Sequence, residues 1–294
     1  MSNLLQRTIT GLIFGIVVIG AIVFNEYSFA ILLLVICVLG LKEFYKLSLS
    51  EANKKYSIIA LVFGIAITTI FISADIFLDH PFYNLTDSFF MVVLTFGFVS
   101  FSVLDIFLNK NPKAGQVLLG LVLIPFSLIL LWKFSHYGYI NCMDIGKDVK
   151  PQYTYTYQLP LTLLVLTWAN DVGAYFSGKF LGKRKLFERI SPNKTWAGFY
   201  GGSILTIVLL FLLNERNLTG LDNLSSVSII LLSITISTFA TFGDLYQSYT
   251  KRIYGVKDSG SILPGHGGIW DRFDGFFFVI YGYFFFQFTS ALFF

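Results

Sequence analysis

The sequence predicts an all-α, polytopic integral membrane protein. Hydrophobic residues make up 55% of the 294 residues, charged residues only 13%, and the mean hydropathy is +0.71. Soluble domains carry about 25% charged residues. Apolar segments of helical length also recur along the whole chain, and a bilayer core of about 30 Å requires about 20 such residues. This composition excludes an ordinary soluble domain.

About nine transmembrane helices are expected from these apolar segments. They lie near residues 8–24, 28–47, 57–79, 89–108, 115–135, 158–178, 198–214, 226–246 and 275–294. The first and seventh are close to the minimum length for a span, and the sixth contains Asn170 and Asp171, so eight or ten spans stay open. No small-residue cleavage site precedes the second segment, which indicates an uncleaved first helix.

Basic residues set the expected topology. If the N-terminus is cytoplasmic, the inner segments hold 17 of the 21 Lys and Arg residues, as the positive-inside rule requires. Nine spans then place the C-terminus outside. The protein is expected to be integral to the cell (inner) membrane, with its active site on the cytoplasmic face. The net charge of +4 suits anionic lipids and substrates at that face, so no nucleic-acid partner is expected.

One membrane domain in three consecutive parts is expected. Residues 1–135 form the N-terminal helices, with about five spans, and residues 136–157 form an outer loop. Residues 158–294 form the catalytic region, with cytoplasmic loops at 179–197 and 247–274. The two cysteines, one in a span and one in the outer loop, indicate neither a disulfide nor a metal site.

The loop at 247–274 carries the densest polar chemistry. If the preceding helix continues past Asp244, then Ser248, Lys251 and Arg252 lie on the same helical face as this carboxylate. The glycines that follow favour a loop whose backbone can approach a ligand closely.

Two acidic residues, Asp271 and Asp274, are spaced to share one face at the start of the last span. Both could instead be ordinary helix caps, and basic residues beside a membrane could simply anchor the inner leaflet. Asp171 is harder to explain in that way, because a carboxylate inside an apolar span is costly and indicates function.

The combination of these residue types narrows the chemistry. Carboxylates without clustered Cys or His suit Mg²⁺, with Mn²⁺ as the alternative, and do not suit zinc. Such a metal with nearby Lys and Arg suits a nucleoside triphosphate, whose charge must be neutralised before an anionic nucleophile approaches.

These motifs resemble the phosphatidate cytidylyltransferase family, also called CDP-diglyceride synthetases. The C-terminal signature is present with its spacing kept, as Ser248, Lys251-Arg252, Lys257-Asp258, Gly260, Leu263-Pro264, His266-Gly267-Gly268 and Asp271-Arg272-Phe273-Asp274. The stretches from Asp171 to Leu186 and from Ser191 to Thr195 resemble two further family motifs. The resemblance covers residues 165–294 well and the N-terminal spans only by hydropathy.

Four positions depart from the family pattern. Thr250 replaces an apolar residue, Gln247 stands where Glu is frequent, Asn193 replaces Lys, and Ala197 stands where Glu commonly follows Thr-Trp. The changes at 247 and 197 remove two acidic groups near the expected site and leave Asp244 and Asp271 in place.

The resemblance implies transfer of a cytidylyl group from CTP to phosphatidic acid, giving CDP-diacylglycerol and pyrophosphate for phospholipid biosynthesis. It places Mg²⁺ on Asp244 and Asp271. The expected catalytic residues are Asp244, Lys251, Arg252, Lys257, Asp258, His266, Asp271, Arg272 and Asp274. The expected substrate-binding residues are Asp171, Lys183, Ser191, Asn193, Lys194, Thr195, Ser248, Gly265, Gly267 and Gly268. The partners are CTP, phosphatidic acid and the bilayer, and a homodimer is left open.

Two other classes of protein are weaker alternatives. An ion-coupled transporter would also have broken, glycine-rich helices and an intramembrane carboxylate, but no paired inverted halves are visible. Another membrane phosphotransferase would carry DGxxAR or DDxxD, and neither pattern is present.

Overall fold

The computed structural model describes residues 3–49, 54–78, 113–137, 155–221, 224–256, 258–260, 262 and 267–293. The elements in these ranges, in chain order, are α1 (Asn3–Phe24), α2 (Glu26–Ser48), α3 (Lys54–Leu78), α5 (Lys113–Leu121), the π-helix η2 (Val122–Phe126), α6 (Ser127–Tyr137), α7 (Gln158–Leu181), β1 (Lys185–Phe187), β2 (Ser191–Thr195), α8 (Trp196–Glu215), α9 (Ser226–Ile253) and α10 (Trp270–Phe293).

The helices follow the predicted apolar segments closely. Every predicted segment coincides with a described helix except the fourth, 89–108, which lies outside the described residues. The count of nine therefore stays a prediction. Within the described part, six helical segments are long and apolar enough to cross a membrane: Leu5–Phe24, Glu26–Ser48, Lys55–Ile76, Gly115–His136, Trp196–Glu215 and Ser226–Ile253. The chain is thus a mostly helical, polytopic membrane protein.

Two of the expected spans, α7 and α10, are not among these six. Both helices carry charged residues, which lower their hydropathy: Asp171 and Lys179 in α7, and three residues in the first five of α10. Their crossing of the membrane stays a prediction.

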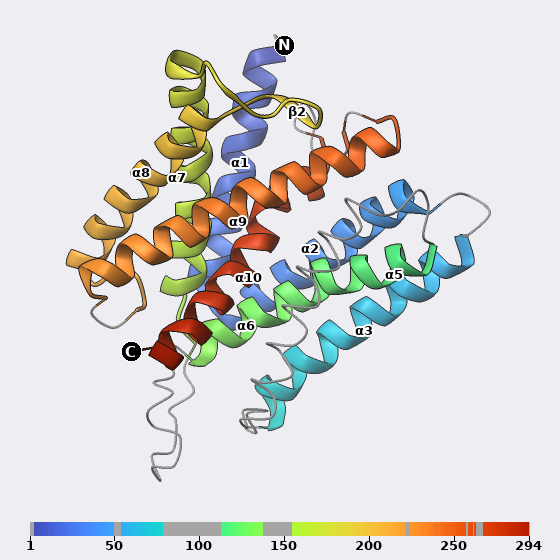
Figure 1. Ribbon diagram of the computed structural model, residues 1–294. Coiled ribbons are helices and arrows are strands. Elements are labelled where there is room, and N and C mark those ends of the chain that lie inside the picture. The colour runs from blue at the N-terminus through green and yellow to red at the C-terminus, as the bar shows by residue number, and fades with distance from the viewer. Residues whose placement is uncertain are drawn as a thin grey trace. The chain divides into compact units, whose positions relative to one another are not determined.

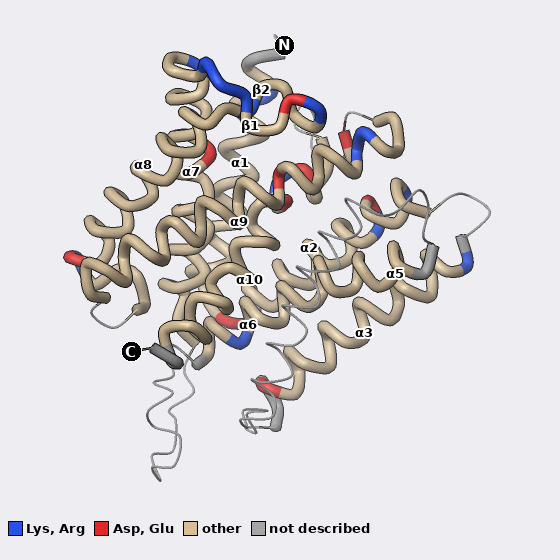
Figure 2. The backbone as a smooth tube through the Cα atoms, viewed as in Figure 1, with Lys and Arg blue, Asp and Glu red and all other residues tan. Residues whose placement is uncertain are grey.

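Part of the predicted loop 179–197 is a β-hairpin, which the all-α expectation did not include. Strands β1 and β2 pair antiparallel, with Lys185 opposite Thr195 and Phe187 opposite Ser191. Pro192 disfavours a helix here, and the extended pairing satisfies backbone groups instead. Figure 2 shows basic residues gathered on this hairpin.

The chain divides into two compact units, each made of two separate stretches. Unit 1 comprises residues 1–132 and 250–273, and unit 2 comprises residues 133–249 and 274–294. The end of α9, the following loop and the start of α10 thus belong with the N-terminal helices.

In unit 1, α2, α3 and α5 pack against one another (Figure 1). The Tyr45 hydroxyl in α2 donates to the Val117 carbonyl at 2.9 Å. Pro125 interrupts the next helix, which adopts π geometry there. Ser127 Oγ donates to the Leu123 and Ile124 carbonyls at 2.8 and 2.9 Å, so oxygens near the break have a donor even in an apolar surrounding.

In unit 2, α7 and α8 run side by side and are joined at one end by the hairpin (Figure 1). Glycines line their contact, because a Cβ on Gly173 would lie 2.8 Å from the Gly201 carbonyl oxygen and 3.0 Å from Gly202 Cα. Small residues allow such close approach of membrane helices. The Thr195 hydroxyl accepts the Gly198 N–H at 3.1 Å and caps the start of α8.

Candidate functional site

A cavity of about 310 Å³ lies in unit 2, where the middle of α7 and the start of α8 meet the hairpin and α9. Its polar walls come from three segments that are distant in sequence. Six of the predicted site residues line it: Asp171, Ser191, Asn193, Lys194, Thr195 and Asp244. The structure thus brings the two motifs of the first loop together with Asp244 of α9.

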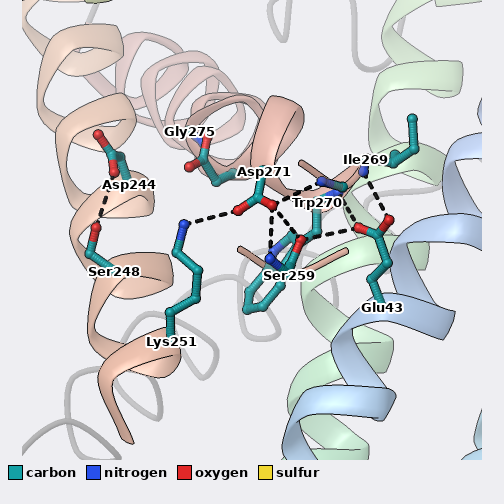
Figure 3. Close-up of polar contacts among 11 residues, drawn as sticks. Glu43, Asp244, Ser248, Lys251, Ser259, Ile269, Trp270, Asp271 and Gly275 are labelled. Carbon is teal, nitrogen blue, oxygen red and sulfur yellow. Dashed lines mark hydrogen bonds and ion pairs between the residues drawn. The ribbon is translucent and has the colours of Figure 1, made fainter. Parts of the chain in front are cut away.

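An ion pair crosses this cavity. Lys194 Nζ lies 2.6 Å from Asp244 Oδ2, and both side chains are partly exposed. The other oxygen, Asp244 Oδ1, accepts the Ser248 hydroxyl at 3.3 Å, one turn further along α9 (Figure 3). Asp274 interacts electrostatically with Asp244, with Asp171 and with Lys194. The cavity therefore combines carboxylates with a lysine that offsets part of their charge.

The cavity also contains a polar side chain that was not predicted as a site residue. Asn170 is only 3% exposed, and its Oδ1 has no hydrogen-bond partner among the described residues. A buried amide oxygen without a donor is unfavourable. Its position beside Asp171 in an otherwise apolar span was the signal available in the sequence.

Asp271, the second predicted metal ligand, lies in unit 1, where four donors surround it (Figure 3). Lys251 Nζ donates to Oδ1 at 2.9 Å. Oδ2 accepts the N–H groups of Ser259 and Gly268 at 2.8 and 2.9 Å and the Ser259 hydroxyl at 2.9 Å. Asp271 precedes the predicted span 275–294. Burial raises the pKa of this carboxyl. The Gly268 and Ser259 N–H groups and Lys251 lower it by more in total, so the net pKa is below the usual value.

The conformation of this loop depends on glycine. Gly267 has a φ of +85°, and a Cβ there would lie 2.7 Å from Asp271 Oδ2. Both facts exclude a larger residue without rearrangement. Gly268 is buried beside it and supplies one of the N–H donors to Asp271.

A second carboxylate, Glu43 from α2, binds the other side of the same loop. Oε1 accepts the Ile269 N–H at 3.0 Å, and Oε2 accepts the Trp270 N–H at 2.8 Å and the Ser259 hydroxyl at 3.2 Å. Glu43 was not among the residues predicted from the sequence. The available signal was the one used for Asp171, an acidic residue within a predicted span.

The remaining predicted residues divide by exposure and by description. Lys183, Arg252, Asp258 and Arg272 are exposed, and Lys183 is not part of the cavity wall. The predictions for Lys257, Gly265 and His266 fall outside the described residues.

The predicted metal ligands supply only oxygen donors, which suit Mg²⁺. Asp244 belongs to unit 2 and Asp271 to unit 1, and each lies against a lysine ammonium group within its own unit. Each carboxylate is therefore already paired with an ammonium group, which a bound metal ion would have to displace or share. Among the described residues, no three His, Cys, Asp or Glu side chains are arranged to hold a metal ion.

Known proteins resemble this chain, and one of them does so over nearly its whole length. A model described as the cytidylyltransferase family matches residues 5–290. A phosphatidate cytidylyltransferase of Bacillus subtilis (strain 168) is 31% identical over 282 residues, covering 95% of this chain and 96% of that protein. One from Haemophilus influenzae is 37% identical over 178 residues, covering 57% and 55% of the two chains. One from Staphylococcus aureus (strain COL) is 46% identical over 121 residues, covering 41% and 45%.

Proposed function

This chain belongs to the cytidylyltransferase family, and we propose that it transfers a cytidylyl group from CTP to phosphatidic acid. The products are CDP-diacylglycerol and pyrophosphate. The relative that matches 95% of the chain is named for this activity. The six apolar helices provide the membrane setting that a lipid substrate requires.

The observation that carries the proposal is the cavity in unit 2. It unites Asp171 of the first motif with Ser191, Asn193 and Lys194 of the second and with Asp244, which is 50 or more residues away in sequence. Residues that were expected to bind substrate from motif resemblance alone therefore line one concave surface. Concave sites with a few convergent polar groups are typical of small-molecule binding.

The lysines of the two ion pairs are the groups we assign to phosphate. Lys194 Nζ lies 2.6 Å from the Asp244 carboxylate, and Lys251 Nζ lies 2.9 Å from the Asp271 carboxylate. Each ammonium group could neutralise phosphate charge within its own unit, and clustered phosphate charge has to be neutralised before another anion can approach. Hydroxyl and amide groups on β2 add neutral hydrogen-bond donors.

Mg²⁺ is the metal that we propose, with Asp244 and Asp271 as the residues that would hold it. When bound, it would polarise the α-phosphate and offset the charge of the departing pyrophosphate. A phosphate oxygen of phosphatidic acid attacks the α-phosphorus of CTP, and the bond to the bridging oxygen of the β-phosphate breaks. That oxygen nucleophile is already anionic, so no strong general base is required.

The membrane arrangement that we propose keeps the N-terminus cytoplasmic and the C-terminus outside, with nine spans in the inner membrane. The balance of basic residues supports it, since 17 of the 21 lie in the segments assigned to the cytoplasm. The active site would then face the cytosol, where CTP is available. A homodimer is left open, and no nucleic-acid partner is proposed.

The test is pyrophosphate release by the purified protein in detergent. Release is measured with CTP or ATP, with and without phosphatidic acid, and with and without Mg²⁺. The expected result is release only when CTP, lipid and Mg²⁺ are all present, and its loss in a correctly folded Asp271→Asn variant. If folded wild-type protein releases nothing under any condition, the proposed activity is wrong, and ion-flux measurements would test the transporter alternative.

A further inference from the structure

Glu43 is a buried carboxylate in the N-terminal half whose partners all come from the C-terminal signature. Glu43 is 4% exposed. Its hydrogen-bond donors among the described residues are the N–H groups of Ile269 and Trp270 and the hydroxyl of Ser259. A buried charge is stable only when it is well hydrogen-bonded. Here the two N–H groups at the start of α10, a 24-residue helix, provide donors and the favourable end of the helix dipole.

Ser259 connects Glu43 to Asp271. Its hydroxyl lies 3.2 Å from Glu43 Oε2 and 2.9 Å from Asp271 Oδ2, while its N–H donates to the same Asp271 oxygen (Figure 3). Gly268, one residue before the N–H groups that Glu43 binds, also donates to Asp271. A shift of Glu43 would therefore reach Asp271 through both Ser259 and the 268–270 backbone.

The loop is shaped to receive the Glu43 side chain. A Cβ on Gly260 would lie 2.5 Å from Glu43 Oε1, and one on Gly268 would collide with the Glu43 carboxylate. Both glycines belong to the signature that was recognised without reference to Glu43. Part of that glycine pattern is thus explained by the need to admit this carboxylate.

We infer that Glu43 is a positioning residue for the cytidylyl transfer and acts through Asp271. It contacts the loop and not the cavity described above, and it fixes where Asp271 and its partner Lys251 lie. This inference rests on the proposed function, because positioning matters only if Asp271 takes part in the reaction. An error of about 1 Å in the position of a reacting group can lower a rate about 100-fold.

The experiment compares Glu43→Gln with Glu215→Gln in the full-length protein. Glu215 is an exposed carboxylate at the last residue of α8, so its substitution controls for the loss of one acidic group. In Glu43→Gln, an amide NH₂ replaces one of the two acceptor oxygens and faces a backbone N–H donor. Three quantities are measured: kcat with saturating phosphatidic acid, KM for CTP, and hydrogen exchange of the amides at 267–271.

The expected result for Glu43→Gln is a kcat lower by about 10- to 100-fold, a KM for CTP within about twofold of wild type, and faster exchange at 269–270. Glu215→Gln should match wild type in all three. A purely structural role would lower the amount of folded protein and leave the kcat of the folded fraction unchanged, and that result would overturn the inference.

Ser259→Ala keeps the test decisive if Glu43→Gln does not fold. It removes only the hydroxyl shared by the two carboxylates, and a lowered kcat at unchanged KM is again expected. Wild-type kcat in this variant, with Glu43→Gln either unfolded or fully active, refutes positioning through Asp271. If the wild-type protein itself shows no transfer, the proposed function fails, while the exchange measurement still decides whether Glu43 holds the loop.

Discussion

Replacing Gly173 by alanine should push α7 and α8 apart. The added Cβ would lie 2.8 Å from the Gly201 carbonyl oxygen and 3.0 Å from Gly202 Cα. Carbon atoms in contact prefer about 3.5–4.0 Å. Both neighbours are backbone atoms, so no change of side-chain rotamer relieves the overlap, and the helices have to separate by about 0.5 Å or more. A gap of that size removes about a quarter or more of each dispersion contact it opens.

The expected cost is obtained by comparison with Gly15→Ala. A Cβ at Gly15 meets nothing within 4 Å, so this variant shares the gain in helix propensity, about 1 kcal/mol, without the overlap. The difference between the two variants therefore isolates the packing cost, about 1–3 kcal/mol for an overpacked contact. By the scaling of soluble domains of 150–250 residues, this corresponds to a difference in Tm of about 2–12 °C.

The assay is thermal unfolding of both variants in the same detergent, followed by circular dichroism. Gly173→Ala should unfold at the lower temperature and should also lose transferase activity, because α7 and α8 both line the cavity. Equal Tm values for the two variants would refute the close contact of α7 with α8.

Three further predictions concern the site. Lys194→Met should raise KM for CTP about tenfold or more, because it removes the cation 2.6 Å from Asp244. Lys55→Met, at an exposed position, should leave KM unchanged. Equal KM values for the two variants would exclude Lys194 from nucleotide binding. Thr195→Val removes the cap of α8 and should lower the free energy of unfolding by about 1 kcal/mol. The control is Thr69→Val, because the exposed Thr69 hydroxyl donates to the Ile65 carbonyl of its own helix. A Tm of Thr195→Val equal to that of wild type would contradict the capping role. Chelation with EDTA should abolish pyrophosphate release and added Mg²⁺ should restore it, since the predicted ligands are carboxylates. Pyrophosphate release that persists after complete chelation would exclude a role of the metal in the reaction.

Hydropathy predicted the helices well because burial in lipid imposes one dominant rule on sequence. The span was predicted to end near residue 246, with a loop from 247, but α9 continues to Ile253. Under the condition that the helix continued, Ser248 was expected on the face of Asp244, and its hydroxyl does donate to that carboxylate. These features depend on local periodicity alone, which a single sequence contains.

The contribution of Glu43 could not be derived in the same way. It lies 216 residues before Ser259 and 226 before Ile269, and no local pattern reports a contact at such separation. For the same reason, no local pattern could predict that the loop after α9 groups with the N-terminal helices. The hairpin was missed because Ser191–Thr195 is short and polar, and its pairing with Lys185–Phe187 lacks the alternation that identifies longer strands.

The distance along the chain between Glu43 and its donors also has a consequence during synthesis. At about 5–20 residues per second, a ribosome needs about 10–45 s to make the 226 residues from Glu43 to Ile269. Until those residues are made, the Glu43 carboxylate of α2 has none of these donors. A chain released before Ser259 would keep this carboxylate without those donors, and an ionisable side chain inside an apolar span is costly. Synthesis of Ser259, Ile269 and Trp270 therefore also supplies the hydrogen-bond donors that Glu43 has lacked since α2 was made.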